Sequence, residues 1–465
     1  MNKYFFFDTA CTEKLTNAQV VPGAIEKLDL NPLFTEEFFA KQPRKWEVRY
    51  DNGYPNVFWD AAAQLYRCYY TLFVHDPDSE ATSLEERRHK NYKPLPGRTT
   101  ALCYAESKDG FHWIKPNLGL VEFEGNRDNN IVRMYAHGAS VFLDVQEKDA
   151  RKKYKMLLRD DNKPRRLAVC FSADGLNWSE LEYWPEYSRA IEADSFNFAF
   201  RDEAGLYHFY SRKWSRDIRV IAHSVSEDFV HWSEPTEVFR GNGLDDQIYA
   251  MPVFQDGNLY FGLCSIFHDG NRDEDWDCVD LELAYSGDGE HWTRITPGEP
   301  LIQRGEGRYP DGAYDCGCIY SSTPVFLPEE IRFYYMGGNG QHTNYRETSL
   351  CCARMGSDRY SAVTEIYTEE EASLTTGKFL CTGEDVCLTA DLEPHGFVEV
   401  YAVDKCGNAK KLKRLNNPSD KEVKLTAEAI WTPGKCQEAA FELRFNRGKL
   451  YSISGGIQRI PNHNI

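Results

Sequence analysis

The sequence lacks the signatures of several common protein classes. Its 465 residues contain no run of 18 apolar residues, which excludes a membrane-spanning helix. It has no P-loop, no dinucleotide-binding glycine motif and no serine-nucleophile elbow. No CxxC pair and no helical HxxxH spacing occurs, so we expect neither a metal site nor a cofactor.

Positive charge is scarce relative to negative charge. There are 54 Lys and Arg residues against 72 Asp and Glu residues, a formal net charge of −18. Such a surface opposes binding to nucleic acid and to anionic membranes, and it suits a neutral small molecule better. This composition is also compatible with a homo-oligomer.

Fourteen cysteines are present, and we expect them to be reduced. Most lie inside apolar, strand-like segments, where a thiol behaves as a small apolar side chain. The start, MNKYFFFDTACTEK, has only a three-Phe apolar run, too short for a signal-peptide core. Both observations favour a cytoplasmic protein.

One short motif occurs four times. Residues 107–113 read SKDGFHW, 172–178 read SADGLNW, 226–232 read SEDFVHW and 286–292 read SGDGEHW. Three β-rich segments precede each copy, as in FNFAFRD, LYHFYSR and RVIAHSV before the third. A weaker fifth copy consists of STPVFL, IRFYYMGG and SLCCARMGSDRYSAV. Five four-stranded units predict an all-β fold, a five-bladed β-propeller, with Asp-Gly as a turn and Trp packed between blades.

The repeat covers only part of the chain. Residues 41–370 are assigned to the propeller, and residues 1–40 to an N-terminal extension that closes it or adds an edge. After about residue 370 the sequence pattern changes to short segments of alternating apolar and polar residues, separated by Gly, Asn and Pro turns. This predicts a C-terminal β-sandwich over residues 371–465.

Candidate site residues stand just before the first strand of each unit, because these positions converge at one mouth of a propeller. They are Trp46, Glu47 and Asp51; His137 and Gly138; Glu192 and Asp194; Asp245 and Asp246; Asp311 and Asp315. Carboxylates with aromatic neighbours suit glycoside cleavage, which needs a proton donor and a base or nucleophile. We expect the crowded acids to raise the pKa of one of them, supplying the proton donor. For any one of them, a solvated turn residue is an equally good interpretation.

The A-x-S-x-D-G-x-x-W repeats and Y-x-x-Y-Y second strands over residues 40–370 resemble the five-bladed propeller glycosidases that act on fructosides, arabinosides and xylosides. The C-terminal sandwich is similar to the accessory domain of the fructosidase branch. The resemblance implies a nucleophile or base on the first blade, Asp51 or Glu47, and an acid on the third, Asp194 or Glu192.

The W-M-N-D-P-N-G, R-D-P and E-C-P boxes of those enzymes are missing, and the second blade has no carboxylate in register. A further branch of propeller proteins is more similar, sharing W-E at Trp46–Glu47, D-x-x-N at Asp194–Asn197 and G-G-N-x-x-H at Gly337–His342.

Six residues are candidates for binding substrate: Trp46, Asp246, Asp315, His342, His268 and Arg212. Three hypotheses remain. The leading one is a glycoside hydrolase of short oligosaccharides. The second is a propeller-type phosphorylase with a phosphate pocket drawn from Arg212, Arg219, Arg304, Arg308 and His342, and the acid-rich funnel argues against it. The third is a sugar-binding propeller without catalysis.

Overall fold

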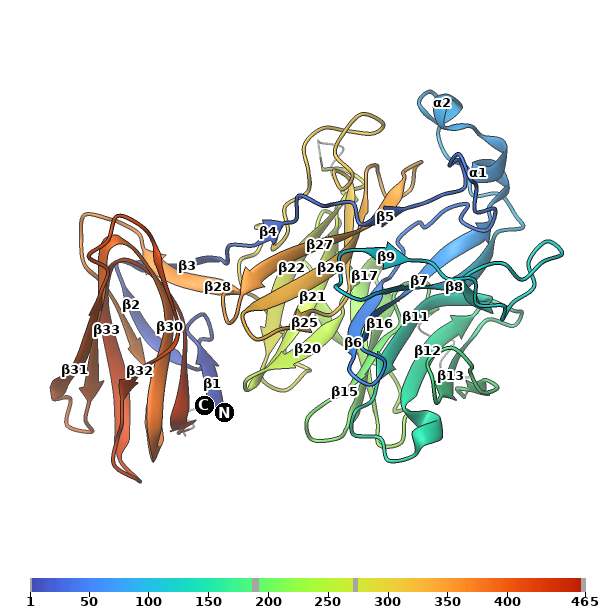
Figure 1. Ribbon diagram of the computed structural model, residues 1–465. Coiled ribbons are helices and arrows are strands. Elements are labelled where there is room, and N and C mark those ends of the chain that lie inside the picture. Colours follow the sequence, from blue (N-terminus) through green and yellow to red (C-terminus); the bar gives the residue numbers. More distant parts are fainter. Residues whose placement is uncertain (1, 186–191, 271–274, 461–465) are drawn as a thin grey trace.

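The computed structural model describes residues 2–185, 192–270 and 275–460. Strands dominate these ranges, and the helical elements in them are short: α1 (Pro77–Ala81), α2 (Leu84–Arg87) and the 3-10 turn η1 (Ala150–Lys152). The all-β prediction is therefore confirmed. Figure 1 shows a smaller lobe that contains both β1 and β33, beside a larger lobe with the middle of the chain. In the described part, none of the helices has the length and apolar character needed to cross a membrane.

The first three sequence units each form a separate sheet in the larger lobe. Sheet 1 contains β6 (Asn56–Asp60), β7 (Leu65–His75), β8 (Thr99–Ser107), β9 (Trp113–Ile114) and β10 (Ile131–Met134). Sheet 2 contains β11 (Ala136–Leu143), β12 (Tyr154–Asp160), β13 (Arg166–Ser172) and β14 (Glu182–Tyr183). Sheet 3 contains β15 (Phe198–Arg201), β16 (Tyr207–Ser215), β17 (Ile218–Ser226) and β18 (Thr236–Arg240).

The fourth and fifth units share one larger sheet. Sheet 4 is the part with β19 (Gln247–Ala250), β20 (Val253–Asp256), β21 (Leu259–Phe267), β22 (Val279–Ser286) and β23 (Thr293–Arg294). Sheet 5 is the part with β24 (Cys318–Ser321), β25 (Val325–Phe326), β26 (Glu330–Gly338) and β27 (Thr348–Gly356). They join where Val279 pairs with Cys318. From the N-terminal region, β4 (Glu26–Lys27) and β5 (Phe34–Thr35) pair with β27.

The repeated Ser-x-Asp motif forms the same turn in all four copies. In the first copy, Ser107 Oγ accepts a hydrogen bond from the Gly110 N–H, and Asp109 Oδ1 accepts two from the next N–H groups. Trp113 Nε1 then donates to the Gly110 carbonyl at 3.0 Å. Its ring lies edge-on to Tyr334 of sheet 5, at 5.8 Å between centroids. The expected turn and the packing of this Trp between sheets are confirmed.

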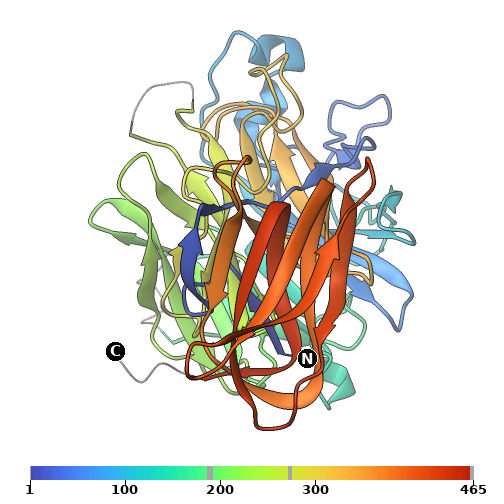
Figure 2. The same ribbon diagram turned by 90° about the vertical axis from the view of Figure 1, so that its left-hand side faces the viewer.

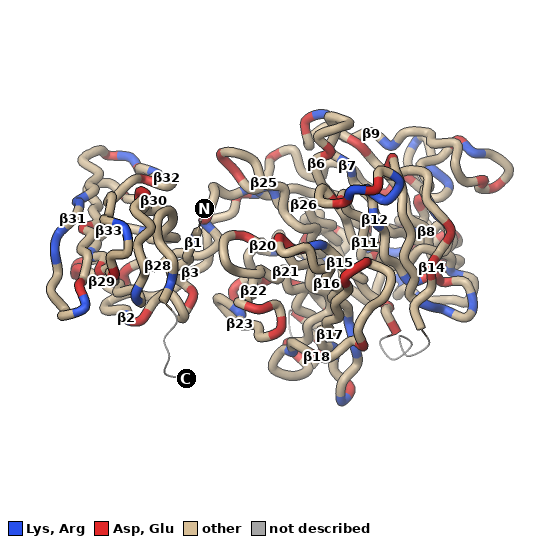
Figure 3. Tube along the Cα trace, turned by 90° about the horizontal axis from the view of Figure 1, so that it is seen from below, with Lys and Arg blue, Asp and Glu red and all other residues tan. Residues whose placement is uncertain are grey.

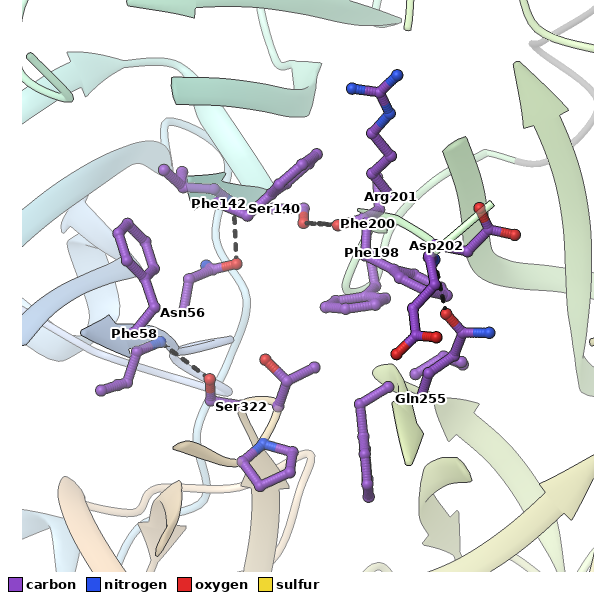
Figure 4. Close-up of a pocket in the computed structure, with 18 of the residues that line it drawn as sticks. Asn56, Phe58, Ser140, Phe142, Phe198, Phe200, Arg201, Asp202, Gln255 and Ser322 are labelled. Atoms are coloured by element: carbon purple, nitrogen blue, oxygen red, sulfur yellow. Dashed lines mark hydrogen bonds between the residues drawn. The ribbon is translucent and has the colours of Figure 1, made fainter. Parts of the chain in front are cut away.

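Side chains on or beside the first strands join successive sheets (Figure 4). Each bonds to the backbone of the next sheet's first strand: Ser322 with Val57 N, Asn56 with Val141 N, Ser140 with Ala199 N, and Ser195 with Tyr249 O. Together with the Val279–Cys318 pairing, these contacts run from sheet 1 through sheet 5 and back to sheet 1. A largely apolar cavity of about 300 Å³ is lined by residues of the same strands.

The smaller lobe is a nine-stranded sheet assembled from both ends of the chain, here called the C-terminal sheet. It contains β1 (Asn2–Phe5), β2 (Thr12–Thr16), β3 (Ala18–Pro22), β28 (Ser361–Glu365), β29 (Ala372–Thr376), β30 (Phe379–Val403), β31 (Ala409–Asn416), β32 (Val423–Trp431) and β33 (Glu438–Arg459). Figure 2 shows β1–β3 among the strands of this lobe. Residues 2–22, assigned from sequence to an extension of the propeller, thus lie in this lobe.

Charges of both signs are spread over the surface (Figure 3). One basic stretch is β31, with sequence AKKLKRLN. Three of its four cations are paired: Lys411 and Arg414 with Glu399, and Lys413 with Glu428. The positive charge of this strand is therefore largely neutralised.

The three-Phe run at the N-terminus connects the two lobes. Because successive side chains of a strand point to opposite faces, Tyr4 and Phe6 join the core of the C-terminal sheet, while Phe5 and Phe7 join the core shared with sheets 4 and 5. Phe5 lies 5.3 Å from Phe261 between ring centroids. One strand therefore contributes to two cores.

We expect Phe5→Ala to lower the free energy of unfolding by about 3–5 kcal/mol, because it leaves a cavity between the lobes. Phe326→Ala is the matched control, since Phe326 is 47% exposed. Urea unfolding measures both variants. Equal losses would contradict the role assigned to Phe5.

Candidate active site

A cavity of about 300 Å³ lies where the loops before the first strands of several sheets converge. Loops of sheets 1 and 2, the segment before β15, and the loop between β26 and β27 all contribute to it. The lining residues are Arg49, Asp51, Asn52, Tyr54, Phe73, Tyr92, Pro94, Arg98, His137, Arg159, Asp161, Arg165, Asp194, Tyr249, His342 and Thr343. Asp51, Asp194 and His342 are thus brought together, as the sequence predicts.

Asp51 occupies a turn just before β6 and is held between two guanidinium groups. Arg49 Nε donates to Asp51 Oδ1 at 3.1 Å, and Arg346 Nη2 donates to the same oxygen at 2.9 Å. Burial opposes ionisation of this carboxyl, but Arg346 and Arg49 outweigh that effect and hold its pKa well below the ordinary value. Asp51 is therefore a carboxylate in the free protein.

Arg346 fixes the floor of the cavity. Its side chain is fully buried, and besides Asp51 it donates to Asn52 Oδ1 at 2.6 Å and to the Gln341 carbonyl at 3.0 Å. It also donates to the His342 carbonyl. One guanidinium thus connects the turn at Asp51 with the loop that carries His342.

His342 is a neutral imidazole on the cavity wall. Burial and then the positive charge of Arg346 lower its pKa well below the ordinary value. Its Nδ1 lies 2.9 Å from the Tyr320 hydroxyl, and its ring stands edge-on to Tyr249 at 4.7 Å. A neutral imidazole so placed can exchange a hydrogen bond with a bound hydroxyl or anion.

Asp194 faces cations. Its carboxylate oxygens lie 3.3 Å from His137 Nε2, 3.0 Å from Arg159 Nη1 and 3.5 Å from Arg212 Nη2. Burial raises its pKa, but His137, Arg159 and Arg212 outweigh burial and lower the pKa to about 2. The expectation that crowded acids would raise this pKa is wrong for the free protein, because arginines stand between the carboxylates.

A third carboxylate was missed by the sequence analysis. Asp161 follows β12, the second strand of sheet 2, and accepts hydrogen bonds from Arg159 Nε at 2.7 Å and Thr100 Oγ1 at 3.0 Å. The carboxylate candidates all precede first strands, whereas Asp161 follows a second strand. The run LLRDD, with an arginine two residues before the acid, is the signal that could have found it.

Backbone strain accumulates around the cavity. Five non-glycine residues on its loops adopt the left-handed region: Asp51, Tyr54, Tyr135, Glu192 and Ala193, with φ between 40° and 60°. Such conformations cost energy for side chains other than glycine and cluster at functional sites. The strain is a further reason for treating this cavity as the candidate site.

Arg212 lies just behind Asp194, and Glu192 lies beside the cavity. The Arg212 side chain is 5% exposed and stacks over the Tyr249 ring at 4.9 Å. Glu192 has an exposed side chain in a neighbouring hollow, and its carbonyl accepts a hydrogen bond from Arg159 Nη1 at 3.2 Å.

The other predicted site residues lie outside the cavity, because ion pairs or hydrogen bonds engage them elsewhere. Glu47 is completely buried against Lys115 at 2.7 Å, and Trp46 Nε1 donates to Asn130 Oδ1 at 2.7 Å. The remaining three are also engaged: Asp246 by Arg294, Asp315 by Lys27 and Tyr335, and His268 by Asp280. Arg304, a candidate for a phosphate pocket, pairs with Asp275 and Asp280.

No protein-family model and no curated protein matches the sequence. Similar solved structures include an N-acetylgalactosamine deacetylase from F. plautii in complex with blood group B trisaccharide (16% identity, 74% of this chain and 97% of that chain, TM-score 0.45). Another is a glycosyl hydrolase from Bacteroides ovatus (16% identity, 73% and 96%, TM-score 0.45). A third comes from work on the GH130 family of mannoside phosphorylases, which contains glycoside hydrolases that target β-1,2 mannosidic linkages in Candida mannan (15%, 71% and 94%, TM-score 0.45). Function is inferred below from the cavity itself.

Replacing Arg346 with Met should lower the free energy of unfolding by about 3–5 kcal/mol at neutral pH, because it leaves the buried Asn52 without its donor and Asp51 with Arg49 as its remaining arginine partner. The folded-state pKa of Asp51 lies below its unfolded value, so its contribution is present above about pH 4 and is lost as the pH falls below that value. The Arg346→Met penalty should therefore shrink in urea unfolding at acidic pH. Arg354→Met, at a 43% exposed ion pair, is the control and should cost about 0–1 kcal/mol. Equal penalties at neutral pH would refute the role of Arg346.

Gly138→Ala tests how closely the sheet 2 loop approaches the segment carrying Asp194. A Cβ there would lie 1.8 Å from the Ser195 carbonyl oxygen, at φ +54°. Gly119→Ala is the control, since Gly119 has φ +69° and nothing within 4 Å of the added carbon. The control should lose only the backbone penalty of about 1–2 kcal/mol, and Gly138→Ala should lose clearly more in thermal unfolding. Equal losses would show that Ser195 moves aside freely.

Proposed function

We propose that this protein is a glycoside-active enzyme that works in the arginine-lined cavity, with a short oligosaccharide as one substrate and inorganic phosphate as the attacking group. The observation that carries the proposal is the local charge. Four arginines and three aspartates line the cavity, and Arg212 and Arg346 contact two of those aspartates. Six guanidinium groups thus face three carboxylates in a protein whose net charge is −18. This concentration of cations favours an anionic ligand.

Arg212 and Arg219 supply the anion site. They extend from β16 and β17, and both stack against Tyr249, at 4.9 Å and 5.5 Å from its ring centroid. Arg219 Nε is buried and has no hydrogen-bond partner among the described residues. Such a donor costs free energy unless a ligand uses it. The sequence-based objection to a phosphorylase, an acid-rich funnel, is removed by these arginines.

The protonation state of the carboxylates supports phosphate as a substrate. Hydrolysis with two carboxyl groups needs one of them protonated, yet adjacent cations hold the pKa of Asp51 below its ordinary value and that of Asp194 at about 2. A phosphate bound at Arg212 offsets one cation beside Asp194 and adds negative charge nearby. Both changes raise the pKa of Asp194. Binding of phosphate therefore favours the protonated form of Asp194, which is the proton donor.

The reaction then follows from the positions of these groups. A phosphate oxygen forms a bond to the anomeric carbon, the glycosidic carbon–oxygen bond breaks, and the leaving oxygen takes the proton of Asp194. His342 and Asp51, which also line the cavity, hold sugar hydroxyls. The products are a glycosyl phosphate, with the phosphate on the anomeric carbon, and a shortened oligosaccharide.

Two other functions are distinguishable from this one. Asp51 and Asp194 facing one cavity also suits the glycoside hydrolase inferred from sequence. The missing family boxes favour a sugar-binding protein without catalysis. The carbohydrate ligand itself follows from the propeller glycosidase resemblance, and we propose that sheets 1–5 are the five blades of such a propeller, since their contacts return to sheet 1.

The test is to incubate the protein with di- to tetrasaccharides of fructose, arabinose, xylose and mannose, here called the oligosaccharide panel, with and without inorganic phosphate. Mannose is included because one compared protein is described with mannosidic linkages. We expect a glycosyl phosphate, with phosphate on the anomeric carbon, in the ³¹P NMR spectrum only when phosphate is added. Arg219→Ala should raise the KM for phosphate at least about tenfold, the loss of one charge-assisted contact.

Arg240→Ala is the control, because Arg240 is 41% exposed on β18; it should leave the KM unchanged. Asp194→Asn should abolish turnover. Release of free sugar at the same rate without phosphate would overturn phosphorolysis and establish the hydrolase. Binding of sugar without any turnover would establish the non-catalytic protein.

A further inference from the structure

Trp214 is an exposed aromatic residue at the end of β16. Its exposed fraction is 41%, which is unusual for a residue of this size on a strand. The ring is held in place: the guanidinium carbon of Arg219 lies 4.6 Å from its centroid, and that of Arg212 lies 5.6 Å away. Arg219 is also the cross-strand partner of Trp214 in β17. An indole held by one buried and one partly buried cation presents a fixed apolar surface to solvent.

This surface is continuous with the cavity through the same arginines. Arg212 contacts Asp194, which lines the cavity, at 3.5 Å. Arg212 and Arg219 both stack against Tyr249, another lining residue. Tyr249, the guanidinium groups and Trp214 therefore form a line of planar groups from the cavity to the surface. A ligand that extends from the cavity along this line would meet the exposed indole, and this direction is here called the exit.

A second apolar side chain stands near this exit. Leu244 is 54% exposed, and its carbonyl accepts hydrogen bonds from Gln247 Nε2 at 3.2 Å and Asp269 N at 3.1 Å. Gln247 Oε1 in turn accepts from Arg219 Nη1 at 3.0 Å. Hydrogen bonds through Gln247 thus link Leu244 to Arg219, so that amide and guanidinium groups connect the exposed leucine with the exposed indole. Apolar faces beside hydrogen-bonding groups match a sugar ring, which has C–H faces and a hydroxyl edge.

We infer that Trp214 is a specificity-determining residue, which stacks against the second sugar ring of an oligosaccharide whose first ring occupies the cavity. The inference rests on the proposed function and adds to it a minimum chain length. A monosaccharide glycoside with a small leaving group ends inside the cavity and does not reach Trp214. A trisaccharide covers the indole and the surface toward Leu244. Trp214 contacts no reacting bond, so it acts on binding.

The experiment compares Trp214→Ala with Trp59→Ala. Trp59 is the matched control, since it is 36% exposed on β6 and packs on Tyr66 rather than at the cavity. For each protein, KM and kcat are measured with the trisaccharides of the panel and with the 4-nitrophenyl glycosides of the same four sugars. Binding is followed in parallel by quenching of tryptophan fluorescence, which needs no turnover.

We expect Trp214→Ala to raise the KM for trisaccharides at least about tenfold, as for loss of a stacked aromatic anchor, with little change in kcat. The KM for 4-nitrophenyl glycosides should stay within about twofold, and Trp214→Phe should restore most trisaccharide binding. Trp59→Ala should behave as the unchanged protein, and quenching by trisaccharides should disappear only in Trp214→Ala.

Two results overturn the inference and leave the proposed function standing: an unchanged trisaccharide KM in Trp214→Ala, or an equal rise for the trisaccharides and the 4-nitrophenyl glycosides. A fall in kcat alone also overturns it, because it would place Trp214 in the reaction. If no member of the panel binds or is cleaved by the unchanged protein, the proposed function and this inference both fail.

Discussion

The buried guanidinium of Arg346 is the interaction on which the candidate site depends. A cation without solvent must be satisfied by the protein, and here its partners belong to two distant segments: the turn at Asp51–Asn52 and the loop at Gln341–His342. Satisfying this charge fixes both segments at once. The turn's left-handed backbone at Asp51 is stable only because this network holds it. The protein thereby gains a carboxylate and an imidazole on one floor, at the cost of a strained turn.

The repeating architecture could be predicted from the sequence because its cause is local. The Ser-x-Asp turn is closed by hydrogen bonds within six residues, so the same letters produce the same turn in every copy. The alternating strands before it are equally local. The placement of Asp51, Asp194 and His342 in one cavity could also be predicted, since each precedes a first strand or follows a second one in a repeating unit.

Other features depend on contacts between residues that are distant in the sequence, and they could not be predicted from it. Arg49, Arg98, Arg159 and Arg165 are scattered over more than one unit, and only the fold brings them together. One of them, Arg159, together with His137 and Arg212, reverses the electrostatic prediction for Asp194. Glu47 and Asp315 are carboxylates at the sequence positions expected for the site, before a first strand. In the structure, however, they form ion pairs with Lys115 and Lys27, outside the cavity. Acid residues counted along a sequence give no information on which of them meet a cation.

The C-terminal sheet has a consequence for how the chain is made. Its strand β1 pairs with β33, with Asn2 opposite Gly455, so β1 cannot complete its pairing until β33 has been synthesised. Until then Tyr4 and Phe6 have no core to enter, while Phe5 and Phe7 can already meet sheets 4 and 5. On the ribosome, the larger lobe can therefore form first and hold β1 in place. The strand β1, held on the larger lobe, then serves as a template on which β33 pairs once it has been synthesised.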